Sequence, residues 1–365
     1  MKTGLTLPEL AQEIQRQADA KKDILAPVSA LKAVATIEKG APIFGINIEG
    51  KGFFPPTRIA NQQIATYTGI PSPYYKRMET EAPGLLAINI NRWFDGLAQK
   101  GDQRLARTMD GNLRALLSDR FPVCYDNFQL ANVILPLVPQ LGLSIVSSDI
   151  TETKFYLKAI DTSKMTTLKL GQVLGRGHDR IDEVAPGLLV SNSEVGQGRL
   201  VIESGVYTLK CTNMANFGGK LSRLHIGSKA DISEEAYSLL TNATLTKVQE
   251  AFWAQVKDVV SGGFTPEAFQ ANCERLMAAG QDALPPTKVM EVIELVQERF
   301  SWTNEESRSV LDHLIEGGDL SRYGLHSAVT RTAQDLPSYD RASEFERFGG
   351  QIIELNRSEW HRMAA

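Results

Sequence analysis

The chain has 365 residues, of which 42% are hydrophobic and 22% charged, and its formal net charge is -4. This composition is that of a folded globular protein with more than one core, and it excludes a disordered or collagen-like chain. The three cysteines are widely spaced and form no CxxC pair, which argues against a disulfide framework or a zinc site and fits a reducing compartment.

The hydropathy pattern gives no sign of a membrane segment. Residues 1–17 lack the apolar centre of a signal peptide, and the most apolar later stretch, residues 131–148, is interrupted by Pro136, Pro139 and Gly142. We therefore expect a soluble, cytoplasmic protein with no membrane partner.

The N-terminal region contains two helical signals. Thr6 followed by Glu9 predicts a capped helix that runs to about residue 23. Residues 58–78 predict a short helix, a Gly-Ile-Pro break and a second helix that begins near Ser72, which are the lengths of a helix-turn-helix. A plain helical hairpin is the alternative; a DNA-reading helix would begin with Tyr74, Tyr75, Lys76 and Arg77.

The central region reads as a series of hairpins. Asp110-Gly111 separates two alternating segments within residues 103–119, and residues 143–148 and 153–160 predict two more strands after a helix that begins near residue 126. Residues 187–193 and 199–211 predict a further pair of strands joined by a turn at Gly196–Gly198, with a bulge at Ser204-Gly205. Helical patterns follow residue 231 almost to the end.

These elements predict an α+β fold: a mostly antiparallel central sheet of hairpins, with N-terminal helices and a C-terminal helical region. The predicted regions are residues 1–84, which carry the helix-turn-helix-like segment, residues 85–230, which form a mixed α+β domain, and residues 231–365, which are helical.

Charge is unevenly distributed along the chain. Residues 154–229 contain eleven Lys and Arg against six Asp and Glu, whereas residues 231–319 contain six against sixteen. A basic sheet interleaved with aromatic residues can bind single-stranded nucleic acid by phosphate neutralisation and base stacking, or can simply pair with the acidic helices. The candidate nucleic-acid-binding residues are Arg176, Arg180, Asn192, Arg199, Lys210, Asn213, Lys220 and Arg223.

The sequence contains no specific motif for catalysis or for cofactor binding. The loop GRGHDRIDE at residues 175–183 matches no metal-ligand spacing and lacks the GK[ST] of a nucleotide-binding loop, so we expect no metal and no cofactor. Cys211 with His225, or Ser191 or Ser193 with a base, would be needed for covalent catalysis, but no nucleophile elbow is present. The enzyme alternative is a polar pocket formed from His178, Asp179, Glu194 and His225.

Several sequence blocks resemble a known family. LLVSNSEVGQGRLVI, YTLKCTN and LHIGSK, flanked by ALLSDRFPVCYDN and YGLHSAVTRTAQ, are similar to the signature of the phage and plasmid protein family catalogued as domain of unknown function 932, over roughly residues 110–350. Family members commonly have Gly where this chain has Met214.

The resemblance implies a mobile-element protein acting in the host cytoplasm. It favours single-stranded DNA as the partner, in annealing or recombination, together with assembly into a homo-oligomer. The alternative that it implies is an anti-defence or regulatory module that binds a host protein, with the acidic helices after residue 231 as its surface.

Overall fold

The structure is a computed structural model of the chain. It describes residues 2, 4–38, 41–119, 121, 126–172, 179–209, 213–216, 242–262 and 264–365. Contacts divide the chain into two compact units. The small unit contains residues 11–128 and 193–198, and the large unit contains the remaining residues.

The large unit is built on a six-stranded antiparallel sheet, in which β12, β11, β10, β8 and β7 follow one another and β9 pairs with the first half of β10. Its strands are β7 (Ser144–Ile150), β8 (Phe155–Ile160), β9 (Thr166–Gln172), β10 (Asp179–Asn192), β11 (Val201–Thr208) and β12 (Asn213–Asn216).

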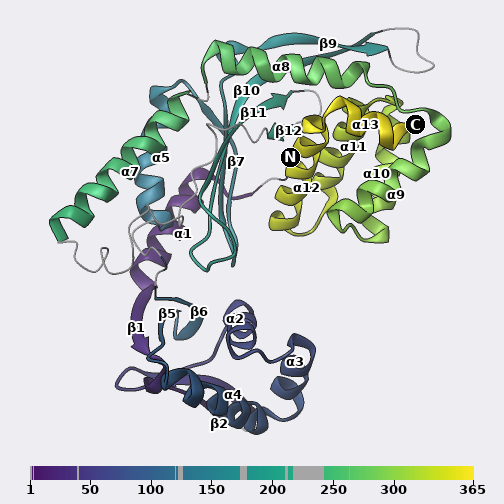
Figure 1. Cartoon of the computed structure of the whole chain (residues 1–365). Coiled ribbons are helices and arrows are strands. Elements are labelled where there is room, and N and C mark those ends of the chain that lie inside the picture. Colours follow the sequence, from purple (N-terminus) through teal and green to yellow (C-terminus); the bar gives the residue numbers. More distant parts are fainter. Residues whose placement is uncertain are drawn as a thin grey trace. The chain divides into compact units, whose positions relative to one another are not determined.

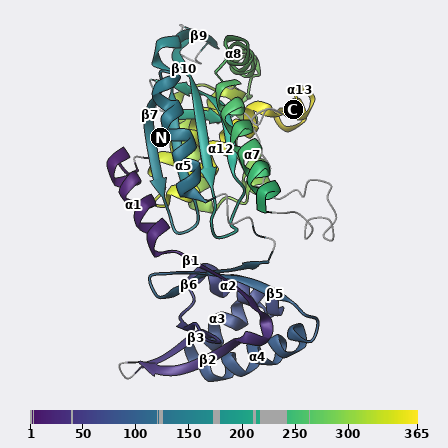
Figure 2. The same cartoon turned by 90° about the vertical axis from the view of Figure 1, so that its left-hand side faces the viewer.

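Helices cover both faces of this sheet. α5 and α7 lie over one face, and α11 and α12 lie over the other (Figures 1 and 2). All six residues of β8 are buried as a result. The helices are α5 (Asn127–Gln140), α7 (Asn242–Gly262), α8 (Pro266–Gln281), α9 (Val289–Phe300), α10 (Asn304–Gly317), α11 (Arg322–Asp335), α12 (Tyr339–Glu354) and α13 (Arg357–Ala364).

The small unit combines two three-stranded antiparallel sheets with helices. One sheet has the order β1-β5-β6 and the other the order β2-β3-β4. Its main core joins apolar residues of the strands to those of the helices, such as Ile46, Ile64 and Ile90. The elements are α1 (Leu7–Ala20), whose first turn belongs to the large unit, β1 (Lys22–Pro27), β2 (Leu31–Glu38), β3 (Ala41–Ile48), β4 (Gly52–Phe54), α2 (Arg58–Thr68), α3 (Ser72–Glu81), α4 (Pro83–Ala98), β5 (Gln103–Met109) and β6 (Asn112–Ser118).

The predicted α+β class is confirmed, as are the hairpin around Asp110-Gly111 and the antiparallel pairing of the strand that contains residues 187–191 with residues 201–205. The predicted bulge at Ser204-Gly205 is wrong, because both residues pair in continuous register with β10. Met214 lies in β12 opposite Tyr207, so the chain continues as a strand where family members commonly have Gly.

The division into units differs from the predicted boundaries at residues 84 and 230. Residues 85–128 pack with the N-terminal region, and that region contains four strands besides its helices. Within the described ranges, no helix combines the length and the apolar character needed to cross a membrane.

Candidate nucleic-acid interface

Arg180, a predicted phosphate ligand, lies in a network of polar side chains within the large unit. Its guanidinium donates to Asp182 at 2.9 Å and to Asp319 at 3.2 Å, and it lies over the ring of Tyr323 at 4.8 Å. A guanidinium with two carboxylate partners has little positive charge left for a phosphate. Its observed contacts join β10 to the segment that precedes α11 and to α11 itself.

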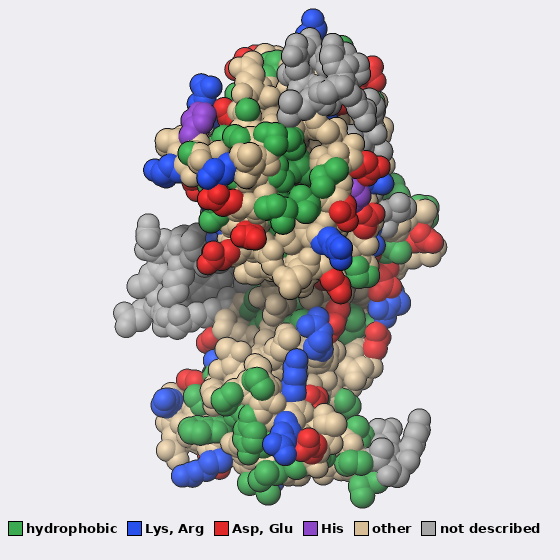
Figure 3. All heavy atoms as spheres, turned by 90° about the vertical axis from the view of Figure 1, so that its right-hand side faces the viewer, with side chains coloured by type: hydrophobic (Ala, Val, Ile, Leu, Met, Phe, Trp, Pro, Cys, Tyr) green, Lys and Arg blue, Asp and Glu red, His purple; other side chains and the backbone are tan. Residues whose placement is uncertain are grey.

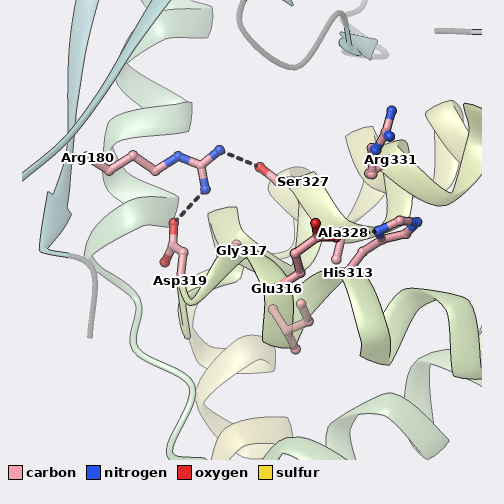
Figure 4. Close-up of a pocket in the computed structure, with 10 residues that line it drawn as sticks. Arg180, His313, Glu316, Gly317, Asp319, Ser327, Ala328 and Arg331 are labelled. Carbon is pink, nitrogen blue, oxygen red and sulfur yellow. Dashed lines mark hydrogen bonds and ion pairs between the residues drawn. The ribbon is translucent and has the colours of Figure 1, made fainter. Parts of the chain in front are cut away.

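A shallow cavity of about 190 Å³ adjoins Arg180 (Figure 4). Its lining carries both signs of charge, with Arg180 and Arg331 opposed by Glu316 and Asp319. His313 in the same lining makes a 2.6 Å contact with Asp335. The mixture does not favour an anionic ligand.

Three of the other predicted residues, Asn192, Arg199 and Asn213, lie within the described ranges. Asn192 is buried at the end of β10, Arg199 is exposed, and Asn213 is the first residue of β12. Because β8 and the second half of β10 are buried, the centre of the sheet presents no open face to a nucleic acid. The predicted residues that lie outside the described ones are Arg176, His178, Lys210, Cys211, Lys220, Arg223 and His225.

Glu194 is buried in the small unit, with 4% of its surface exposed. One carboxylate oxygen accepts from Arg114 at 2.9 Å, and the other accepts from the backbone N–H of Asn127 at 2.8 Å and lies 3.5 Å from Lys21 Nζ. Arg107 donates to the backbone carbonyl of Glu194 at 2.8 Å.

The charge state of Glu194 follows from these contacts. Burial raises the pKa of this carboxyl, but Lys21 and Arg114 outweigh burial and leave the pKa below its ordinary value. A carboxylate held ionised by several donors is a poor general acid. The structure therefore explains Glu194 as a buried anchor, while His178 and His225 of the predicted catalytic pocket lie outside the described residues.

α2 and α3 are two helices joined by a short turn, as predicted for residues 58–78. α2 begins at an N-cap, Thr57, and ends at Gly69, whose φ of 69° is left-handed. Three residues separate the two helices, and Ile70 in this turn is 6% exposed. A side chain at Gly69 would be strained, which is why glycine suits a turn that redirects the chain this tightly.

Side chains fix the angle between the two helices. Tyr75 and Met78 on the inner face of α3 are buried, as is Ala65 on α2. Asn61 of α2 accepts from the Tyr75 hydroxyl at 2.8 Å and donates to Glu79 at 2.7 Å. The predicted contact residue Tyr75 is thus a core residue, and its ring does not reach the surface.

The outer face of α3 is exposed and basic in its first half. Tyr74, with 49% exposed, stands there with Lys76 and Arg77. Figure 3 looks onto the side of the molecule where α2 and α3 lie and shows Lys and Arg side chains gathered over the small unit beside hydrophobic ones. Arg77 pairs with Glu81 at 2.9 Å, and both side chains are largely exposed.

A groove of about 240 Å³ runs between α2 and α3. Its lining includes Arg58, Gln62, Ser72 and Lys76, and also the carboxylate of Glu79, so two cations stand there against one acidic side chain. The sequence interpretation missed Arg58 and Gln62, although their spacing of four residues, on the side of the helix away from Ile64, is a signal that both share an outer face. The groove and the outer face of α3 together form one polar surface, which we call the α2–α3 surface.

Within the described ranges, no three His, Cys, Asp or Glu side chains come together as a metal site would require. Comparison with models of known protein families, with curated proteins and with solved structures gave no match. The family resemblance of the central blocks therefore stays a prediction.

Proposed function

We propose that the protein binds DNA through the small unit, with α3 in the major groove of a duplex. One observation carries this proposal: a helix-turn-helix whose second helix buries Tyr75 and Met78 and turns Tyr74, Lys76 and Arg77 to solvent. The major groove admits an α-helix, and the first residues of such a helix meet base edges and phosphates.

The side chains of the α2–α3 surface suit distinct roles. Lys76 is a point charge for a backbone phosphate, whereas the guanidinium of Arg77 can donate twice to guanine. The Arg77–Glu81 pair does not prevent this, because an ion pair this exposed is worth at most about 1 kcal/mol. Arg58 and Gln62 line the groove beside α3, and this position supports a contact with the DNA backbone.

Nucleic acid thus remains the partner that the sequence favours, but the contact moves from the central sheet to the small unit and from single strands to a duplex. The reasons are the covered centre of the sheet and the carboxylate partners of Arg180. The mobile-element setting that the resemblance implies remains part of the proposed function, and no reaction is assigned.

Binding of the full chain to labelled duplex DNA and to its separated strands, at two salt concentrations, tests this function. A pool of random duplexes serves as the probe. We expect duplex binding to weaken steeply with salt, and Lys76→Glu to reduce the slope of log affinity against log salt by about 1. Arg77→Ala should cost about 1–3 kcal/mol on the preferred sequence and relax the preference at one base pair.

Lys100→Glu is the matched control. Lys100 is an exposed cation of the same unit, but α4 separates it from α3. A helix of this length spans about 24 Å, so the reversal at Lys100 should leave binding nearly unchanged. Equal effects of the reversals at positions 76 and 100, or tighter binding to single strands than to the duplex, would contradict the proposed function.

A further inference from the structure

The loop of residues 193–198 lies against the first helix of the helix-turn-helix. The side chain of Val195 is fully buried, in a cluster that contains Ile59 of α2 together with Leu105 and Leu117. These residues form a second hydrophobic core of the small unit, and the loop contributes Val195 to it.

Gln63 of α2 connects the loop to the sheet β1-β5-β6. Its side-chain amide donates to the carbonyl of Val195 at 2.8 Å, and its side-chain oxygen accepts from the N–H of Leu116 at 2.8 Å. One side chain therefore fixes α2 to both the loop and β6. Gln63 stands next to Gln62, which lines the groove of the α2–α3 surface.

Gly196 allows the loop to approach this closely. Its φ is 72°, and a Cβ there would lie 2.9 Å from Leu117 and 3.5 Å from the Gln63 amide. Any side chain at this position meets both backbone strain and the atoms beside α2. Glu194, the residue before Val195, is itself held in place, because its buried carboxylate accepts from Arg114 and from the N–H of Asn127.

We infer that the loop of residues 193–198 is a positioning element for the α2–α3 surface: it sets where α2 stands, and through α2 it sets the affinity for DNA. The second half of this inference rests on the proposed function, and the first half does not. The docked loop and bound DNA then stabilise one another, since coupling between two sites is reciprocal.

Two measurements on the full chain test the inference. The first is amide hydrogen exchange of α2 relative to β5 and β6, and the second is the dissociation constant for duplex DNA well below the unfolding temperature. For Gly196→Ala and Gln63→Ala we expect exchange in α2 and the dissociation constant each to rise about fivefold or more.

Gly101→Ala is the matched control. Gly101 also has a left-handed φ, of 77°, but nothing lies within 4 Å of the Cβ position. The two glycine variants thus carry similar backbone strain, and only Gly196→Ala disturbs the contact with α2. A merely structural cost would affect both alike.

The outcomes separate the inference from the proposed function. If hydrogen exchange in α2 is unchanged in both Gly196→Ala and Gln63→Ala, the inference is overturned, whatever the affinity of these variants for DNA. Faster exchange in α2 with unchanged DNA affinity would overturn its second half. If the unaltered chain binds no duplex while exchange in α2 responds to the loop, the proposed function fails and the positioning of α2 stands.

Discussion

Glu194 is a candidate catalytic residue in the sequence, but its contacts in the structure are those of a structural residue. The cations around it, Lys21, Arg107 and Arg114, are balanced by three carboxylates, because Asp126 pairs with Lys21 and Asp23 pairs with Arg107. Buried charges are tolerated only when they are paired and hydrogen-bonded, and removal of one partner from such a set leaves another charge uncompensated. The network explains why the loop carries a carboxylate without invoking chemistry.

His326 of α11 predicts a pH dependence of stability. It is 2% exposed, and burial lowers its pKa from 6.5 to about 4. Between these values the unfolded chain binds a proton that the folded chain does not, so the free energy of unfolding falls as the pH falls from about 6.5 toward 4. We expect His326→Leu to flatten this dependence between about pH 7 and 5, measured by urea unfolding at each pH.

The control for His326 is His361→Leu on the exposed side of α13. This variant should keep the pH dependence of the unaltered chain, because it leaves the buried His326 in place. Equal slopes for the unaltered chain and the His326 variant would refute the role of His326.

At the scale of elements, alanine is expected to have opposite effects at two glycines, one in the turn between α2 and α3 and one in the last turn of α4. Gly69→Ala should destabilise the small unit by about 1–2 kcal/mol, because φ there is left-handed. Gly96→Ala, within α4 and with open space around the Cβ position, should stabilise it by about 0.4–1 kcal/mol.

Chemical unfolding of the two variants, followed by circular dichroism, checks the sign of each change. Gly69→Asn offers a further comparison, since asparagine tolerates the left-handed region better than alanine and should fall between glycine and alanine. A stabilising effect of alanine at position 69 would show that the turn adopts another conformation.

Local signals account for the elements that the sequence predicted. Gly69 with Ile70 marks the turn between α2 and α3, Asp110-Gly111 marks a hairpin, and the alternation in residues 201–208 marks a strand. The strands β1 to β4 were not foreseen, because their stabilisation comes from packing on α2 and α4. The supposed bulge at Ser204-Gly205 came from an apparent change of phase in the sequence, but both residues pair with β10 in continuous register.

The contacts of the site were harder to foresee than its elements. Glu194 lies 173 residues from Lys21, 80 from Arg114 and 67 from Asn127 along the chain. No spacing rule connects such residues, and Arg180 looked like a free cation because Asp319 is 139 residues away. For the exposed face of α3, the sequence predicted only four consecutive residues, 74–77, and one of them, Tyr75, is buried.

At the scale of the whole molecule, each unit has a core of its own, and a buried ion pair in the large unit provides a test of their separation. Lys158 of β8 donates to Glu346 of α12 at 2.5 Å, and both side chains are 1% exposed. Burial lowers the pKa of Lys158, but Glu346 outweighs burial and leaves the pKa raised.

Glu346→Gln should destabilise the large unit by about 3–5 kcal/mol, because it leaves a buried ammonium without its counter-charge. Hydrogen exchange should quicken in β8, α11 and α12 and stay unchanged in α2 to α4. The double variant Lys158→Met with Glu346→Leu should recover most of the loss. Uniformly faster exchange over both units would mean that they unfold as one.

The discontinuity of the small unit sets an order on its folding during synthesis. Most of the unit is complete once residue 128 has been made, but its remaining residues, 193–198, follow only after residues 129–192, which include β7 to β10. Domains generally fold in the order in which they leave the ribosome. In this chain the small unit becomes complete only after residues 193–198 have been made, and Arg114 lacks the carboxylate of Glu194 until then. Translation of the central sheet therefore times when the α2–α3 surface becomes complete.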